Sequence, residues 1–354
     1  MLERSNTQRR FYPLFRNPSR HSVQRARFTK PRILVLSPST RFQDFLEYLT
    51  DFEISVINIG QTLDRHQSKL PSQSTTALLK AAIRKLTFRS KLRKLVNGYD
   101  LIFCDWLDSY AAAVSQLARK PMLLRMHRHE IYYPKLIESV NWNAFSKVVA
   151  VSNEYGRLIR DAIKASVPVQ VIYNGLNLEH FPFKPSASGA LCTYCFHNGM
   201  KRSYDLMLAL RDFRLHVGGT DGGEGYDIPC MQSAIERFGL RHVLEGYVDI
   251  PKWLHDKEYF ISHSMDESFG VAFLEAMASG LICLRHDDRV AGEIVPEGYR
   301  YRYNDELVSK LHYFSTLSDK ERLQHKQTLR RIVESKFDVR QQADAFRTLF
   351  LSLM

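Results

Sequence analysis

A strand, a polar loop and a helix follow one another between residues 259 and 280, and this order restricts how the chain can fold. The apolar run from Tyr259 to Ser262 predicts a buried strand. A helix is predicted from Val271 to Ser279, and Gly280 can end it in a left-handed cap. The first turn of a helix has backbone N–H groups without intrahelical partners, and its dipole favours negative charge. Residues Ser268 to Ala272 therefore predict an anion site suited to a nucleotide diphosphate.

Two glutamates flank this predicted anion site. Glu267 lies in the loop and Glu275 lies eight positions later, in the second turn of the helix. Both carboxylates can accept hydrogen bonds from sugar hydroxyls, and Gly270 between them lets the backbone come close to a ligand. On the spacing alone, two surface carboxylates near a helix N-terminus, where the dipole favours them, are the simpler interpretation.

The whole string E-S-F-G-V-A-F-L-E-A-M-A-S-G, residues 267–280, is more specific than the spacing. It resembles the E-x7-E signature of glycosyltransferase family 4, which consists of retaining enzymes with the GT-B fold. The resemblance covers residues 31–354 and is stronger in the second half of the chain. It implies two Rossmann-like domains with a cleft between them, and a C-terminal helix that crosses back to the first domain.

The order of predicted elements supports an α/β fold. Short apolar runs alternate with helical segments in both halves of the chain, which is typical of βαβ units and parallel sheets. We expect four parts: a mobile basic N-terminal arm (1–30), a Rossmann-like acceptor domain (31–184), a Rossmann-like donor nucleotide-sugar domain (185–337) and a crossover helix packing on the first domain (338–354). One predicted strand, Arg214 to Val217, ends before Gly218-Gly219.

Composition restricts the compartment and the partners. The 354 residues carry a formal net charge of +12, which favours an anionic partner without choosing among nucleotide, nucleic acid and lipid headgroup. No apolar run is long enough to span a membrane, and five scattered cysteines suggest a reducing compartment, so we expect a cytoplasmic protein. Cys192 and Cys195 form a single C-x-x-C, which we interpret as structural.

Two strongly basic segments, residues 1–30 and 78–96, are candidates for contact with an anionic membrane surface. Such contact would make the protein a peripheral membrane protein. Alternatively, the first segment is a solvated tail or an organellar targeting peptide, and the second is a domain helix with a solvated polar face. The chain lacks a zinc finger and an RNA-binding aromatic motif, so nucleic acid is not expected as a partner.

A histidine follows the predicted strand Met122 to Met126, at the strand end where a parallel sheet binds ligands. The resemblance implies that His127 faces the cleft and contacts the sugar. Histidine titrates near neutral pH and can donate or accept a hydrogen bond there. His129 is the alternative in another register, and local pairing of the histidine with Glu130 is the structural alternative.

The donor diphosphate needs cations, and the resemblance places them after the strand that begins at Leu191. Lys201 and Arg202 supply the charge, although the family's arginine directly after the strand is missing and the segment is shorter. The glycine pair that the family often has after its first strand is missing as well, because Ser37 follows Leu36. The remaining predicted donor contacts come from the central string: Ser268, Phe269, Gly270, Val271 and Glu275.

The resemblance implies a metal-independent retaining glycosyltransferase, a hexosyltransferase that transfers sugar from a UDP- or GDP-sugar without a cofactor. By the resemblance, Glu275 holds the ribose, Glu267 holds the transferred sugar, and the basic pair neutralises the leaving diphosphate. The acceptor is expected to be a lipid-linked or glycan acceptor at a membrane surface. The alternative is a non-catalytic GT-B-like protein that binds nucleotide sugars and acts through its basic surface. The missing arginine and glycine pair motivate that alternative.

Overall fold

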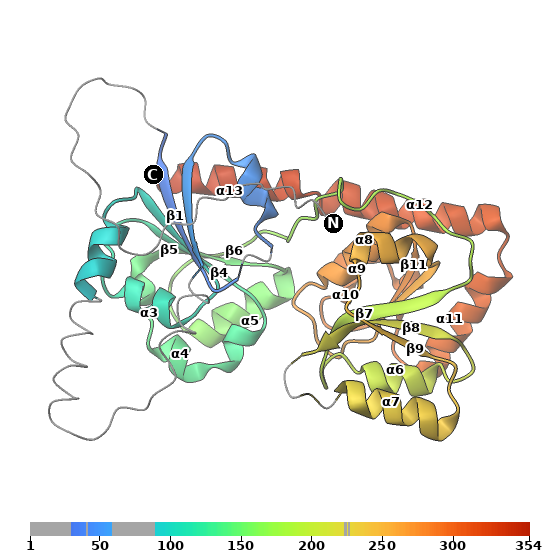
Figure 1. Ribbon diagram of the computed structural model, residues 1–354. Coiled ribbons are helices and arrows are strands. Elements are labelled where there is room, and N and C mark those ends of the chain that lie inside the picture. The colour runs from blue at the N-terminus through green and yellow to red at the C-terminus, as the bar shows by residue number, and fades with distance from the viewer. Residues whose placement is uncertain (1–29, 40–41, 59–88, 223–224, 226) are drawn as a thin grey trace, which may run out of the picture. The chain divides into compact units, whose positions relative to one another are not determined.

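The computed structural model describes residues 30–39, 42–58, 89–222, 225 and 227–354 (Figure 1). The predicted basic arm, apart from Lys30, lies outside these residues, as does the predicted basic helix 78–96 apart from helical residues 89–96. Within the described ranges, no helix combines the length and the apolar character that crossing a bilayer needs.

The chain divides into two compact units, each built on a six-stranded sheet. Unit 1 contains the described parts of residues 1–149, 159–170 and 347–354, and unit 2 contains residues 150–158 and the described parts of 171–346. In both sheets, the strand pairs whose register the described residues define run parallel, as the alternation of strands and helices predicts. The prediction of a two-domain α/β fold of Rossmann-like units is therefore confirmed.

The two sheets have the same kind of strand order. The first runs β2-β1-β3-β4-β5-β6 and the second runs β12-β11-β10-β7-β8-β9. The first sheet consists of β1 (Arg32–Ser37), β2 (Glu53–Asn58), β3 (Leu101–Asp105), β4 (Met122–Met126), β5 (Phe145–Ala150) and β6 (Val169–Val171). The second consists of β7 (Leu191–His197), β8 (Leu215–Asp221), β9 (Val243–Gly246), β10 (Tyr259–Ser262), β11 (Ile282–His286) and β12 (Arg300–Tyr301).

Helices cover the faces of these sheets. In unit 2, Figure 1 shows α6 and α7 side by side along one face of the sheet, whereas α9 packs against β10 and β11. The α-helices whose bounds lie within the described residues are α3 (Ser109–Ser115), α4 (Pro134–Glu138), α5 (Asn153–Ile163), α6 (Ser203–Ala209), α7 (Asp227–Phe238), α8 (Ile250–Trp253), α9 (Val271–Ser279), α10 (Ala291–Ile294), α11 (Asn304–Thr316), α12 (Asp319–Lys336) and α13 (Val339–Leu353).

The strand order of each sheet reverses at one point, and this point locates the ligand site. In the first sheet β1 lies between β2 and β3, and in the second β7 lies between β10 and β8. Consecutive connections leave such a strand in opposite directions, so a crevice opens at the carboxyl ends of the two neighbouring strands. We therefore expect ligands after β1 and β3 in unit 1, and after β7 and β10 in unit 2.

Strand β8 continues through the glycine pair that the sequence analysis placed after its end. Gly218 and Gly219 pair with Tyr194 and Cys195 of β7, and the strand ends at Asp221. The expected end at Val217 is wrong because the glycines serve close packing instead of a turn. A Cβ on Gly219, at φ +118°, would lie 1.9 Å from the carbonyl oxygen of Cys195.

The last helix begins in unit 2 and ends in unit 1. Near its start, Leu176 exchanges backbone hydrogen bonds with Phe337 (2.7 Å) and Val339 (3.1 Å). Near its end, Phe350 is buried and packs edge-on against Phe52, with ring centroids 5.7 Å apart. Burial of a phenylalanine contributes about 1.5–3 kcal/mol, so residues 347–354 are an integral part of the first unit's core.

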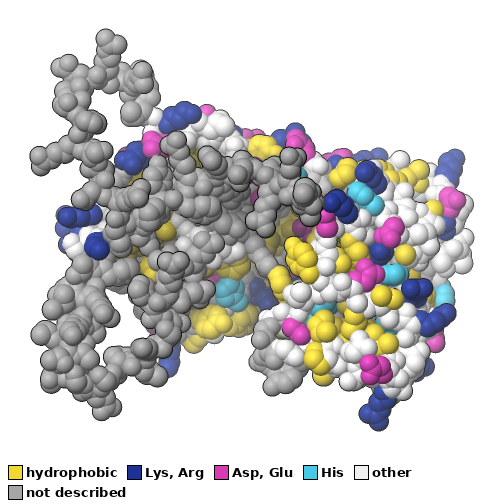
Figure 2. All heavy atoms as spheres, in the orientation of Figure 1, with side chains coloured by type: hydrophobic (Ala, Val, Ile, Leu, Met, Phe, Trp, Pro, Cys, Tyr) yellow, Lys and Arg dark blue, Asp and Glu magenta, His cyan; other side chains and the backbone are white. Residues whose placement is uncertain are grey.

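On one face of unit 2, hydrophobic, acidic, basic and histidine side chains are interspersed, and neither sign of charge dominates (Figure 2). The formal net charge of +12 is therefore not concentrated on that face.

Replacement of Gly219 with alanine should destabilise unit 2 strongly. The added Cβ would overlap the β7 backbone at a positive φ, so we expect a loss of at least about 3 kcal/mol. Gly239→Ala is the matched control, because Gly239 also has a positive φ (+62°) but open space around it, and should cost about 1 kcal/mol. Urea unfolding of both variants measures the difference, and equal losses would contradict the close packing of β7 and β8.

Candidate functional site

The loops after β7 and β10 meet at the strand reversal of the second sheet. The backbone N–H of Met265 donates to the carbonyl oxygen of Met200 at 2.9 Å, which joins the two loops directly. Lys201 in the first loop forms an ion pair with Glu267 in the second. Two residues that were predicted to bind the nucleotide-sugar donor are therefore in contact, although they are 66 positions apart in the sequence.

Glu267 is held as a carboxylate by this contact. Burial raises the pKa of the Glu267 carboxyl group. The positive charges of Lys201 and Arg285 lower this pKa by more than burial raises it, so it lies below its usual value. The Glu267 side chain remains 14% exposed. A carboxylate that is ionised, oriented and partly accessible can accept a hydrogen bond from a sugar hydroxyl.

Arg202 points to a different strand end from its neighbour Lys201. Its backbone is left-handed, with φ +53° and ψ +35°, which is uncommon for a residue other than glycine. Its guanidinium lies 3.3 Å from Asp205 and 3.4 Å from Nε2 of His286, at the end of β11. The two predicted cations are thus spread across the carboxyl edge of the sheet and do not form one pair.

A buried guanidinium supports the start of α9. Nη1 of Arg285 donates to the carbonyl oxygen of Phe269 at 2.8 Å, and a Cβ on Gly270 would lie 2.9 Å from that nitrogen. Gly270 has φ +92°, so the sequence needs glycine here for two reasons internal to the fold. No described side chain caps α9, and its first-turn amides remain suited to an anion.

The predicted donor residues in this loop contribute in different ways. The ring of Phe269 is buried between Tyr173 and Phe337, with centroid distances of 5.8 and 5.3 Å, so only its backbone amide is suited to a ligand. Ser268 and Val271 are half-buried. Gly270 is left-handed and directs the chain into the helix.

Glu275 has a partner that the sequence analysis missed. The hydroxyl of Tyr194, in β7, donates to the Glu275 carboxylate. Burial, together with the Glu275 charge, raises the pKa of the Tyr194 hydroxyl well above its usual value, so tyrosine remains the donor. This bond fixes the carboxylate on the sheet side of α9.

In unit 1, a buried ion pair organises the strand ends. The guanidinium of Arg125 (β4) binds Asp105 (β3) through Nε at 2.6 Å and Nη2 at 2.8 Å, and both side chains have 0% exposure. Gln43, after β1, donates to the same carboxylate at 2.9 Å. The charge of Arg125 is one reason why the pKa of Asp105 is lowered to about 2 although burial alone would raise it.

His127 lies beside this ion pair and is covered by Trp106. The two rings are stacked with centroids 4.0 Å apart, and Nε2 of His127 is 3.9 Å from Asp105. Burial lowers the pKa of the His127 imidazole to about 4. The expectation that His127 titrates near neutral pH is therefore wrong, because its 3% exposure disfavours the charged form.

Glu130 binds the backbone of His127 and the ring of His129. Its carboxylate accepts the His127 backbone N–H at 3.1 Å, and Nδ1 of His129 lies 3.3 Å away. Burial raises the pKa of Glu130 to about 7. The structural alternative of local pairing with Glu130 thus describes the imidazole of His129, whereas it involves only the backbone of His127.

Sequence reasoning missed several residues in or beside these strand ends: Asp105, Trp106, Arg125, Tyr194, His263 and Arg285. Three of them, Asp105, Arg125 and Arg285, are the last or second-last residue of a buried strand. A charged residue at the carboxyl end of an apolar run was the signal that could have identified all three, because parallel sheets bind ligands there. Tyr194 gave no such signal, since it lies inside β7.

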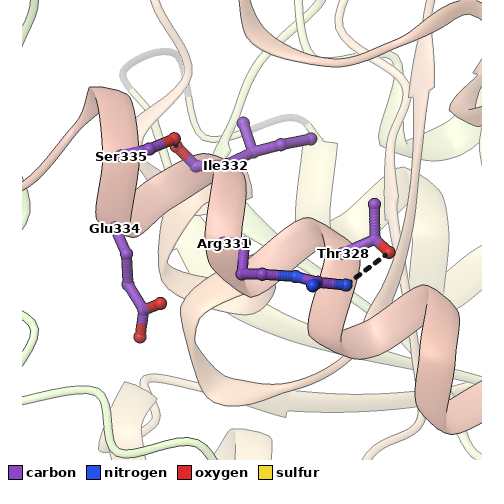
Figure 3. A pocket seen from close by; sticks show the side chains of 5 residues that line it. All are labelled: Thr328, Arg331, Ile332, Glu334 and Ser335. Carbon is purple, nitrogen blue, oxygen red and sulfur yellow. Dashed lines mark hydrogen bonds between the residues drawn. The ribbon is translucent and has the colours of Figure 1, made fainter.

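Other candidate features contribute nothing to these sites. A surface depression on α12 is lined by Thr328, Arg331, Ile332, Glu334 and Ser335, all from one helix (Figure 3). Cys192 is buried, and the Sγ atom of Cys195 lies 3.3 Å from Nδ1 of His197. The described residues include no group of three or more histidine, cysteine or acidic side chains that could hold a metal ion.

Two Rossmann-like units, each built on a six-stranded parallel sheet, are the architecture of the GT-B class of glycosyltransferase folds. The model of Glycosyltransferase Family 4 matches residues 32–180, and the model of Glycosyl transferases group 1 matches residues 200–319. Together the two matches show a glycosyltransferase of the family 4 type, as the resemblance of residues 267–280 suggested.

Solved structures share this fold. HepE of Anabaena, solved in complex with UDP and glucose, has a TM-score of 0.71 at 19% identity, covering 91% of this chain and all (100%) of HepE. A glycosyltransferase from Rickettsia africae has a TM-score of 0.68 at 16% identity, covering 92% of this chain and 98% of that protein.

A curated relative from Xanthomonas campestris, GDP-mannose:cellobiosyl-diphosphopolyprenol alpha-mannosyltransferase, is 25% identical over 209 residues. The alignment covers 52% of this chain and 54% of the relative, so the chain spans about half the length of that protein.

The His127 imidazole should stay neutral from pH 8 down to about pH 5, because burial lowers its pKa to about 4. The unfolded chain takes up a proton near pH 6.5 that the folded His127 resists, so this residue makes stability fall as pH falls from about 6.5 to 4. Histidine NMR signals recorded against pH test the first point, with His127→Gln used for assignment.

The same variant tests the second point through urea unfolding at two pH values. The change in stability between pH 7 and about pH 5 should be less unfavourable in His127→Gln than in the wild type, because the histidine's contribution is removed. A His127 signal that titrates near 6.5 would show that the imidazole is not buried as described.

Proposed function

We propose that the protein is a nucleotide-sugar-dependent glycosyltransferase whose donor site is the carboxyl edge of the second sheet. The observation that carries the proposal is the contact of Lys201 with Glu267 at the strand reversal, beside the open amides of α9. It joins a cation for the diphosphate to a carboxylate for the sugar. An ammonium group, a guanidinium and helix N-terminal amides are the groups that bind phosphate oxygens.

Each donor residue has a separate role in this proposal. Lys201, Arg202 and the amides of residues 268–271 bind the diphosphate. Glu275 accepts hydrogen bonds from the ribose hydroxyls, and Glu267 accepts them from the transferred sugar. In unit 1, His127 contacts the sugar as a neutral hydrogen-bonding group, with His129 as the alternative.

Retention of configuration follows from a same-face displacement in this scheme. The bond between the anomeric carbon and the diphosphate oxygen breaks with its electron pair remaining on oxygen. The acceptor hydroxyl then forms its bond on the same face and loses its proton to that phosphate oxygen. Lys201 and the amides stabilise the charge that develops on the diphosphate, so the scheme requires no metal ion or cofactor.

The names of similar proteins support a class of nucleotide donor and a class of acceptor. HepE was solved with UDP, and the Xanthomonas campestris relative uses a GDP-sugar, so we propose a UDP- or GDP-sugar donor. That relative acts on a diphosphopolyprenol-linked sugar, which supports a lipid-linked or glycan acceptor at a membrane surface. The basic segments 1–30 and 78–96 would then adhere to an anionic membrane on the cytoplasmic side.

The test is donor hydrolysis with a panel of UDP-, GDP- and ADP-sugars, with and without anionic liposomes. We expect nucleotide diphosphate to be released from one donor, and Glu275→Ala to weaken nucleotide binding about ten- to hundredfold, because hydrogen bonds to a charged group are lost. Glu236→Ala, at an exposed site on α7, is the matched control and should leave binding unchanged.

Tyr194→Phe tests the hydrogen bond that holds the Glu275 carboxylate separately from the carboxylate itself. It removes the bond to Glu275 but keeps the carboxylate, so it should weaken nucleotide binding less than Glu275→Ala does. Wild-type nucleotide affinity in Glu275→Ala would contradict the proposed donor site. Thermal stabilisation by one nucleotide without consumption of any donor, even with acceptor lipids present, would favour the non-catalytic binding protein.

A further inference from the structure

The chain has three tryptophans, and one of them differs from the others. The indole N–H of Trp142 donates to the carbonyl oxygen of Ile137 at 3.1 Å, and that of Trp253 donates to the Glu245 carboxylate. The indole N–H of Trp106 is buried and has no hydrogen-bond partner among the described residues. A buried donor left unsatisfied is costly and rare in folded proteins, so this one requires an explanation.

The backbone at Trp106 is also unusual. Its φ is +97°, a left-handed region that bulky residues rarely adopt because it is strained. The residue directly follows β3, at the strand reversal of the first sheet, where its backbone N–H donates to Arg125 at 3.0 Å. Strained backbone at the carboxyl end of a sheet is typical of binding sites.

The strain directs the indole into a cluster of aromatic rings. His127 is stacked on it at 4.0 Å, His129 lies at 5.0 Å, and Phe42 lies at 6.4 Å. The Nε2 atom of His127 is a second buried polar atom without a hydrogen-bond partner among the described residues. Two unsatisfied ring nitrogens therefore occur on stacked rings at the strand ends where the fold predicts a ligand.

We propose that the indole N–H of Trp106 donates a hydrogen bond to a hydroxyl oxygen of a sugar substrate, so that Trp106 is a specificity-determining residue of unit 1. This inference rests on the proposed function. The donor needs an oxygen acceptor, and aromatic rings with polar edges suit a sugar, which is apolar on its faces and polar at its rim.

The surrounding charges favour a neutral hydroxyl over a phosphate or a carboxylate. The charge of Asp105 is neutralised by Arg125, with which it shares two hydrogen bonds. His127 stays neutral because burial lowers its pKa to about 4, so it supplies no positive charge for an anion. An anion bound near Trp106 would be repelled by the Asp105 and Glu130 carboxyl groups when they are ionised, whereas a neutral hydroxyl would not.

The experiment observes the indole N–H directly. Three indole ¹H–¹⁵N signals are expected, which Trp106→Phe, Trp142→Phe and Trp253→Phe assign one by one. The probes are UDP-glucose and GDP-mannose, the sugar-free nucleotides UDP and GDP, and methyl glucoside and methyl mannoside. We expect the Trp106 signal to shift with at least one probe that contains a sugar, while the Trp142 signal stays in place.

The three kinds of probe distinguish a hydroxyl of the transferred sugar from a hydroxyl of the acceptor sugar. A shift with a nucleotide sugar but not with UDP or GDP assigns the hydroxyl to the transferred sugar, and a shift with the methyl glycosides assigns it to the acceptor sugar. Trp106→Phe keeps the ring but removes the N–H, so it should weaken the sugar-containing ligand about tenfold and leave UDP or GDP affinity unchanged. Trp142→Phe should change neither affinity.

The result that overturns the inference is an unmoved Trp106 signal with every probe, in a protein that UDP or GDP stabilises against heat. A bound water would then account for the indole N–H, and the proposed donor site would stand. If no nucleotide stabilises the protein and no probe moves any indole signal, the proposed function and this inference both fail.

Discussion

The loop that opens α9 depends on one buried guanidinium. Arg285 is fully buried, binds Asp288 through Nε at 3.1 Å and Nη2 at 2.9 Å, and donates its remaining nitrogen to Phe269 at 2.8 Å. Removal of either partner would leave an uncompensated charge in the interior, which costs about 3–5 kcal/mol. The direction in which the chain enters α9 therefore depends on this pair, and so do the positions of Glu267 and the first-turn amides.

The first unit uses the same arrangement at its own strand ends. Arg125 binds Asp105 through two nitrogens and also donates to the carbonyl oxygen of Phe42 at 3.0 Å. A buried ion pair contributes little net stability, because desolvation offsets most of the attraction. Its effect in both units is geometric. A rigid, planar guanidinium joins a carboxylate to a loop carbonyl and fixes the loop beside the strand reversal.

The sequence was sufficient for the elements and insufficient for the contacts between them. The predicted strand Tyr259–Ser262 and helix Val271–Ser279 match β10 and α9, because a short apolar run and a glycine-capped helix are local patterns. The contacts of Lys201 with Glu267 and of Tyr194 with Glu275 join residues 66 and 81 positions apart. Such pairs depend on strand order and register, which a single sequence does not reveal. The burial of His127 was missed for the same reason, because Trp106 covers it only after β3 and β4 pair.

Burial also makes the local charge at the strand ends of the first unit differ from that in the second unit. Around Trp106, the charge of Asp105 is balanced by Arg125, His127 is neutral, and the pKa of Glu130 is raised to about 7, so protons and ion pairs cancel most of the local charge. Under the inference about Trp106, such a site recognises hydroxyl groups through neutral donors and acceptors. In unit 2, the side chains of Lys201 and Arg202 remain 23% and 21% exposed, and the first-turn amides of α9 have no side-chain cap. Charge that develops on a leaving diphosphate needs preorganised cations and amides, and under the proposed function only the second of these two environments supplies them.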